Sequence, residues 1–317
     1  MKKKLYHLHF AFCVNDSYAR YISVPIKSIL ENHRDRDISI HVLTDYICWN
    51  NRKILNEIIR NYNRTTLYIY EIDDTDLRDL EAGHWTKYAW YRILIPNILP
   101  KDIKKVLYLD ADTLVVSDLS SVFSIDMGEK SIAAVEDIYS NSKETYNRLG
   151  YDSSKKYICT GVMLMNLDFW RKNLLPAKIV SWAKYNSDSI VAADQDAINY
   201  ICRESKILLP LRFDIFNAFL LSDAYLQMPY LNQVKDCITN PAIIHYSGYA
   251  PWIKDRPQHL LYDEWIKYNK MLRHPVKLIY RAKGFLLLKL YLWDILHPFK
   301  DRYASWKKRH KQEILNR

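Results

Sequence analysis

The sequence predicts an α/β protein with a mainly parallel sheet flanked by helices, and three observations support this. Short apolar, strand-like segments alternate with helix-like segments over the first two-thirds of the chain, which is typical of βαβ units. The chain has 317 residues, of which 49% are hydrophobic, enough for the core of one large or two modest domains. No apolar run reaches the roughly 18 residues that a membrane-spanning helix requires.

The expected elements follow one another along the chain. Residues 5–14 and 38–43 are strand-compatible, and between them apolar residues recur at helical spacing over 18–30, with Pro25 as the one discordant residue. Further strands are expected at 66–72, 105–109, 131–135, 158–166 and 242–245, and further helices around 54–59, at 168–185 and at 194–201. Because ligands of such sheets sit beyond the carboxyl ends of the strands, polar residues there are candidates for a site.

Charge and cysteine content exclude several classes of protein. Residues 270–317 contain thirteen Lys or Arg and three acids, so the whole formal charge of +10 resides in this tail. The charge therefore indicates a binding partner of the tail and says little about the substrate. Five scattered Cys, none spaced C-x-x-C, argue against a disulfide framework and a Cys-based zinc site. The basic, apolar N-terminus lacks a small-residue cleavage site, so we expect a reduced, cytoplasmic protein.

One Asp-x-Asp pair stands out. Asp110-Ala111-Asp112 lies between two apolar runs, at 106–109 and 114–116. Two carboxylates at the end of a buried strand must be paired, hydrogen-bonded or metal-bound to offset desolvation. Such oxygens suit Mg²⁺ or Mn²⁺, which bridge carboxylates to substrate phosphates. The alternative is a solvated acidic turn, which fits the pairs at 35/37 and 74/76 because their surroundings are polar.

The string KKVLYLDADTLVVSDL around this pair resembles the metal-binding segment of glycosyltransferase family 8. Five other segments resemble blocks of that family in the same order: FCVNDSYARY (12–21), YAWYRILIP (88–96, the helix with Tyr-x-Arg), TGVMLMNLDFWR (160–171), ADQDAIN (193–199) and IHYSGYAPW (244–252). The resemblance implies a retaining enzyme with the GT-A fold and a nucleotide-sugar donor. Within the family, the chain resembles bacterial lipopolysaccharide core glucosyl- and galactosyltransferases.

The resemblance also implies residue roles. Asp110, Asp112 and His245 would bind Mn²⁺ (or Mg²⁺), although a lone His after an apolar strand is more often a core residue. Gln195 would lie beneath the anomeric carbon as an electrostatic and positional group, and Asp194 would bind sugar hydroxyls; the alternative is an acidic first helical turn. The expected donor-binding residues are Cys13, Val14, Asn15, Ser17, Tyr18 (stacked on uracil), Arg92, Ala111, Asp137, Gly161, Gly248 and Lys254.

Three departures from the family pattern bear on sugar choice and donor binding. Asn15 stands where relatives often carry Asp, and Cys159 stands where an Asn is usual. The last block is one residue shorter than the common His-x-x-Gly-x-x-Lys-Pro-Trp and lacks its diphosphate-binding Lys. Lys254 is the candidate substitute.

We therefore expect a metal-dependent hexosyltransferase that moves glucose or galactose from a UDP-sugar to a lipid-linked saccharide, such as lipopolysaccharide core. A family-8 transferase acting on another glycan or a glycoprotein, and a catalytically silent UDP-binding scaffold, are the alternatives. The catalytic domain is expected at residues 1–255 and a helical, basic, membrane-associating region at 256–317. The tail lacks the aromatic-basic modules of specific nucleic-acid binding.

The tail is the expected contact with an anionic membrane on its inner, cytoplasmic face. The Leu-rich residues 276–296 form no clean two-faced helix. Beyond Pro298, apolar residues fall within about 80° of one another on a helical wheel, opposite a basic face. The apolar set is Phe299, Tyr303, Trp306 and Ile314; the basic set is Lys300, Arg302, Lys307, Lys308, Arg309 and Lys311. The alternative is a solvated basic helix.

Overall fold

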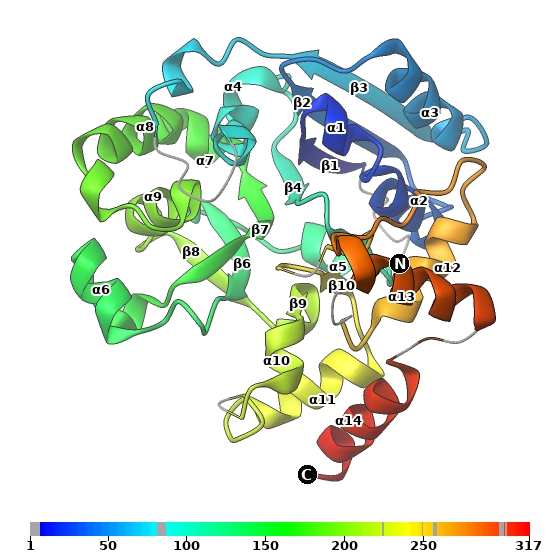
Figure 1. Cartoon of the computed structure of the whole chain (residues 1–317). Helices are drawn as coiled ribbons and strands as arrows, with labels where there is room; N and C mark the ends of the chain where they lie inside the picture. The colour runs from blue at the N-terminus through cyan, green and yellow to red at the C-terminus, as the bar shows by residue number, and fades with distance from the viewer. Residues whose placement is uncertain are drawn as a thin grey trace, which may run out of the picture.

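Seven strands form the central sheet of this computed structural model (Figure 1). The structure describes residues 7–80, 87–223, 225–248, 250–255, 259–297, 301 and 303–317. The strands are β1 (Leu8–Cys13), β2 (Ile38–Thr44), β3 (Thr65–Glu71), β4 (Lys105–Leu109), β6 (Ile132–Glu136), β7 (Ile158–Asn166) and β8 (Lys206–Leu209). Their order is β3-β2-β1-β4-β7-β6-β8, and only β7 is antiparallel to its neighbours. The predicted α/β class with a mainly parallel sheet is confirmed.

Two apolar layers cover the faces of this sheet because side chains alternate along each strand. Phe10 and Phe12 of β1 belong to one core, whereas Ala11 and Cys13 belong to the other. The first core includes side chains of α2 (Ser23–Asn32), α3 (Trp49–Ile59), α11 (Leu231–Thr239) and α12 (Tyr262–Lys270). The second includes α7 (Leu167–Lys172), α8 (Leu175–Tyr185), α9 (Ala193–Ile201) and the 3-10 helix at Lys87–Leu94. The shorter helices are α1 (Asp16–Ala19), α4 (Ile95–Ile98), α5 (Ser120–Phe123), α6 (Lys143–Leu149) and α10 (Asn217–Leu221).

A second, three-stranded sheet joins distant parts of the chain at the carboxyl edge of β4. It consists of β5 (Thr113–Val115), β10 (Ile243–His245) and β9 (Ile215–Phe216), with β10 between the other two. β10 is antiparallel to β5, and His245 is paired with Thr113. The register therefore brings His245 beside the residue that follows Asp112.

The boundaries of several predicted helices are corrected by the structure. The helix expected at 18–30 is divided into α1 and α2, and Pro25 falls in the first turn of α2, where its missing N–H costs no hydrogen bond. The helix expected at 168–185 is broken between α7 and α8 by Leu174, whose φ is +52°. The segment around Arg92 is a 3-10 helix rather than an α-helix.

The C-terminal region contradicts the predicted amphipathic anchor. In α14 (Ala304–Asn316) Ile314 is 1% exposed and belongs to the main core, against which Trp306 also packs. Lys307, expected on the solvated face, is buried and pairs with Asp263. The helix therefore turns its apolar side to the protein body instead of outward. Phe299, Lys300 and Arg302 of the same prediction lie outside the described residues.

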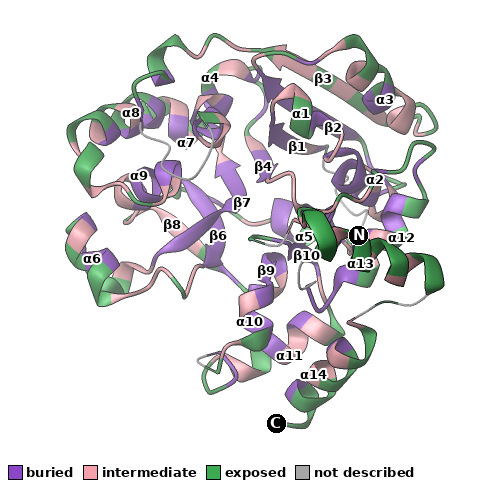
Figure 2. Ribbon diagram, in the orientation of Figure 1, coloured by how far each residue is buried: buried purple, intermediate pink, exposed green. Residues whose placement is uncertain are grey.

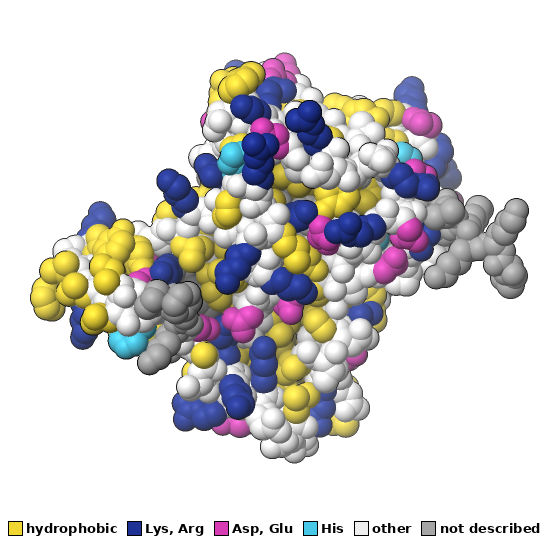
Figure 3. All heavy atoms as spheres, turned by 90° about the vertical axis from the view of Figure 1, so that its right-hand side faces the viewer, with side chains coloured by type: hydrophobic (Ala, Val, Ile, Leu, Met, Phe, Trp, Pro, Cys, Tyr) yellow, Lys and Arg dark blue, Asp and Glu magenta, His cyan; other side chains and the backbone are white. Residues whose placement is uncertain are grey.

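The Leu-rich helix α13 (Gly284–Leu296) has the opposite environment (Figure 2). Within it, no residue is buried, and Phe285 and Leu296 are 83% and 72% exposed. Hydrophobic side chains gather on the protrusion at the left edge of Figure 3, where α13 leaves the body. Among the described helices, none combines the length and the apolar character needed to span a bilayer.

Candidate active site

Two adjoining cavities lie at the carboxyl ends of the central strands. The first, of about 360 Å³, is lined by residues after β1, among them Asn15 and Tyr18, and by Gly248, Trp252 and Ile253. The second, of about 340 Å³, is lined from β7, α9 and the loop after β6, and it includes Asp137, Gly161 and Gln195. Both cavities are lined by Ala89, Arg92, Asp110, Asp112 and Gly248. The acidic pair thus stands at their junction.

Asp110, Asp112 and His245 form a compact group of metal-ligand types at this junction. Their ligand atoms all lie within 4.8 Å of one another. His245 Nε2 is 3.4 Å from Asp112 Oδ1 and 3.9 Å from Asp110 Oδ2. Two carboxylates and an imidazole fit Mn²⁺ or Mg²⁺. The three predicted metal ligands are therefore brought together by the fold.

Gly161 is what permits this approach. Its carbonyl accepts the amide of Asp110 at 2.8 Å, so β7 and the end of β4 are fixed side by side. A Cβ at this position would lie 2.3 Å from His245 Cε1 and 2.8 Å from Asp110 Oδ2. Any side chain here would displace two candidate ligands.

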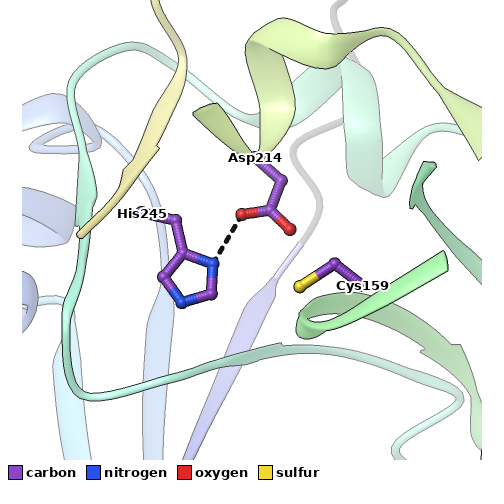
Figure 4. Close-up of side chains that lie close together, drawn as sticks. All are labelled: Cys159, Asp214 and His245. Atoms are coloured by element: carbon purple, nitrogen blue, oxygen red, sulfur yellow. Dashed lines mark hydrogen bonds and ion pairs between the residues drawn. The ribbon is translucent and has the colours of Figure 1, made fainter. Parts of the chain in front are cut away.

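Asp214 orients the imidazole of His245 from the other side (Figure 4). His245 Nδ1 is 2.9 Å from Asp214 Oδ1, which leaves Nε2 directed toward Asp110 and Asp112. Burial opposes the charged imidazolium, but Asp214 and Asp112 together raise the pKa of His245 above its ordinary value. The Cys159 thiol lies within 4.8 Å of the ligand atoms of Asp214 and His245. Burial raises the pKa of this thiol, so the sulfur is a protonated neighbour rather than a thiolate ligand.

Arg92 is the buried cation of the site. Its guanidinium lies 3.1 Å from Asp110 Oδ1 and 3.1 Å from Asp194 Oδ2, and it donates to the carbonyl of Thr160 at 2.7 Å. The residue is 6% exposed, so these partners replace the water that its side chain has lost. Burial raises the pKa of Asp194 to about 7, against the opposing charge of Arg92. The charge of Arg92 is thus already shared between two carboxylates.

Gln195 is held at both ends of its amide. Oε1 accepts the backbone N–H of Thr160 at 3.1 Å, and Nε2 donates to Asp137 Oδ2 at 3.1 Å. Asp196, the next residue, accepts hydrogen bonds from Arg148, Tyr157 and the backbone amides of residues 191 and 192. The Asp-Gln-Asp block therefore divides into two residues that line the second cavity, Asp194 and Gln195, and one structural residue.

The first cavity is walled by the first and last predicted blocks. Asn15 Oδ1 caps α1 by accepting the amide of Tyr18 at 2.9 Å. Tyr21 stacks on Trp252 with ring centroids 3.9 Å apart, and Tyr18, 41% exposed, meets Trp252 edge-on at 5.8 Å. The predicted donor residues Cys13, Val14 and Ala111 line the same cavity.

Two predicted donor residues lie outside both cavities, and one charged residue that lines a cavity, Arg281, was missed. Ser17 donates to Asn15 Oδ1 at 2.8 Å and lines neither cavity. Lys254 pairs with Asp294 of α13. Arg281, from the segment before α13, lines the first cavity. An Arg inside a generally basic tail gave no signal that sets it apart.

The sheet order, the paired cavities and the acidic pair with its histidine define a glycosyltransferase of the GT-A architecture. The solved galactosyltransferase LgtC, in complex with donor and acceptor sugar analogs, shares this architecture: its TM-score is 0.75 at 24% identity, covering 84% of this chain and 97% of that one. The sequence matches the pattern of "Glycosyl transferase family 8" over residues 9–256. The chain belongs to glycosyltransferase family 8.

Two curated relatives are bacterial proteins. General stress protein A of Bacillus subtilis is 29% identical, with 82% of this chain and 92% of that protein covered. A lipopolysaccharide 1,2-glucosyltransferase of Escherichia coli is 25% identical, with 75% of this chain and 71% of that protein covered. The family resemblance inferred from the six sequence blocks is confirmed.

Proposed function

We propose that the protein transfers a hexose, glucose or galactose, from a UDP-sugar to a lipid-linked saccharide of the lipopolysaccharide core type, with retention at the anomeric carbon. The observation that carries the proposal is the position of Asp110, Asp112 and His245 at the junction of the two cavities. A diphosphate at that junction would place its nucleoside in the first cavity and its sugar in the second. The similarity to a lipopolysaccharide glucosyltransferase supports the choice of acceptor class.

Each group of the site has a task in this proposal. Asp110, Asp112 and His245 would hold a divalent cation, which neutralises charge on the departing diphosphate. Arg92 keeps Asp110 and Asp194 in place through its two ion pairs. Gln195, fixed by Thr160 and Asp137, presents an amide dipole to the second cavity. A fixed dipole stabilises developing charge without reorganising, so a positional role suits Gln195 better than nucleophilic attack by a weakly nucleophilic amide.

A donor panel tests the proposal. UDP-glucose and UDP-galactose are incubated with the full chain and Mn²⁺, and released UDP is detected by mass. We expect release with a hexose donor and loss of that release in Asp110→Ala and Asp112→Ala. UDP binding without turnover of any donor, with or without a saccharide acceptor, would favour the silent scaffold instead.

We also propose that α13 lies on an anionic membrane surface, at the inner face of the cytoplasmic membrane. Six of its apolar side chains are exposed, Lys277 precedes the helix and Lys289 lies within it. The six are Phe285, Leu286, Leu288, Leu292, Ile295 and Leu296. Apolar insertion with neighbouring cations is how interfacial helices bind lipid. Leu288→Glu with Leu292→Glu should abolish sedimentation with anionic vesicles at low salt, whereas Tyr185→Glu on α8 should not. Equal sedimentation of all three proteins would refute the role of α13.

A further inference from the structure

Lys254, the lysine that the sequence suggests for binding the donor diphosphate, is paired with another part of the protein. Lys254 Nζ pairs with Asp294 of α13 and lies 5.6 Å from the ring centroid of Tyr280. Lys254 lines neither cavity. The residue therefore ties the body to the C-terminal helix, and the shortened block between His245 and Trp252 supplies no other Lys or Arg.

A different cation reaches the first cavity from the C-terminal segment. The chain returns along residues 252–255 before α13 begins: Ile279 N donates to the Trp252 carbonyl at 2.8 Å, and Lys254 N donates to the Ile279 carbonyl at 2.8 Å. Asp255 then accepts the backbone amides of Arg281 and Ala282 at 2.9 and 2.5 Å. These four bonds fix the backbone at Arg281, and this residue lines the cavity together with Asp110, Asp112 and Tyr18.

The charges of the cavity call for such a group. Asp110 and Asp112 place two carboxylates at the cavity, and the guanidinium of Arg92 is already paired with two carboxylates. A diphosphate adds further negative charge, which one divalent cation only partly offsets. Within the described part of the chain, the Arg281 guanidinium makes no ion pair, and its planar donors match phosphate oxygens.

We propose that Arg281 binds the diphosphate of the donor and replaces the lysine missing from the last block. The inference rests on the proposed function, because it assumes a nucleoside diphosphate in the first cavity. It makes the segment before α13 part of the donor site rather than a tether.

Calorimetry with UDP and with uridine separates a diphosphate contact from a general effect. The full chain, Arg281→Ala, Arg281→Lys and the control Lys283→Ala are titrated with each ligand in the presence of Mn²⁺. Lys283 is an exposed cation two residues away that lines neither cavity. Because hydrogen bonds between charged groups are stronger than those between neutral ones, we expect Arg281→Ala to weaken the affinity for UDP by at least about tenfold, which is about 1.4 kcal/mol. Uridine binding should stay unchanged, and Arg281→Lys should restore part of the loss.

The role of Arg281 and the proposed function are overturned by different results. UDP affinity in Arg281→Ala within about twofold of the wild type would overturn the role of Arg281 and leave the proposed function standing. An equal loss in Lys283→Ala would also overturn it, because the effect would then come from overall charge. Failure of the wild type to bind UDP would overturn the proposed function and this inference with it.

Discussion

Replacing Gly161 by Ala tests whether the open space at this residue allows the two metal ligands to meet. The added Cβ would lie 2.3 Å from His245 Cε1 and 2.8 Å from Asp110 Oδ2, whereas ordinary contact begins near 3.4 Å. His245 must therefore move by roughly 1 Å, several times the roughly 0.2 Å by which metal–ligand distances vary. The strand is less free to move, because the Gly161 carbonyl accepts the amide of Asp110.

The expected result is a protein that folds and binds UDP without the help of metal. Overpacking costs about 1–3 kcal/mol of the free energy of unfolding, which thermal unfolding measures. Calorimetry with UDP in the presence of Mn²⁺ or EDTA gives the metal-dependent part of the affinity. In the wild type Mn²⁺ should strengthen UDP binding; in Gly161→Ala this difference should disappear.

Gly150→Ala is the matched control, because it separates backbone strain from the steric clash. Gly150 ends α6 with φ +70°, and a Cβ there would have nothing within 4 Å. The control should lose about 1 kcal/mol of stability and keep its metal-dependent UDP affinity. Unchanged metal dependence in Gly161→Ala would refute the argument that this space positions the ligands.

Three further predictions concern neighbouring groups. Asp214→Asn keeps the shape beside His245 but removes the charge, and it should weaken Mn²⁺ binding in the presence of UDP by about 10–100-fold; calorimetric Mn²⁺ affinity equal to wild type would rule out the positioning role. Gln195→Ala should lower kcat by about 100-fold with donor affinity nearly unchanged, and equal loss of both would contradict an electrostatic role. His9 Nδ1 lies 3.0 Å from His41 Nε2, and burial lowers the pKa of His9 to about 4 and that of His41 to about 3. Both imidazoles therefore stay neutral in the folded protein, whereas in the unfolded chain they take up protons below about pH 6.5. The free energy of unfolding should therefore fall as pH drops from about 6.5 toward 4, and it should fall less steeply in His41→Asn, as urea unfolding at about pH 7 and about pH 5 would show. An equal fall in both proteins would show that this pair is not the cause.

The sequence predicted the parts of the fold that depend on local pattern. The apolar runs of β1, β2, β4 and β7 are long enough to be recognised as strands. The polar residues that follow β4 identified Asp110 and Asp112 as candidates. β8 was missed because its four residues are too few to show a periodic pattern of apolar side chains. β5 and β9 are shorter still. The break at Leu174 depends on a left-handed backbone at a residue type that seldom adopts one.

The tail was misread for a different reason. A helical wheel shows that Trp306 and Ile314 share a face with aromatic residues, but it cannot show that the protein body occupies that face. The same limit applies to Asp214 and Arg281. Neither belongs to a sequence block of the family, and each reaches the site only through tertiary contacts: Asp214 through β9 beside β10, and Arg281 through the return of the chain along residues 252–255.

The stacking of Tyr21 on Trp252 has a consequence for how the protein is made. The two rings are separated by most of the chain. During synthesis, the wall of the first cavity therefore cannot form until residues 244–252 have emerged from the ribosome. The strands β1 to β4 can pair earlier, because their connections are short in comparison. A nascent chain would thus hold much of its sheet before it could bind a nucleotide. Ligand that binds only the closed form then stabilises the completed chain by mass action, so nucleotide protection against proteolysis reports that synthesis and closure have both finished.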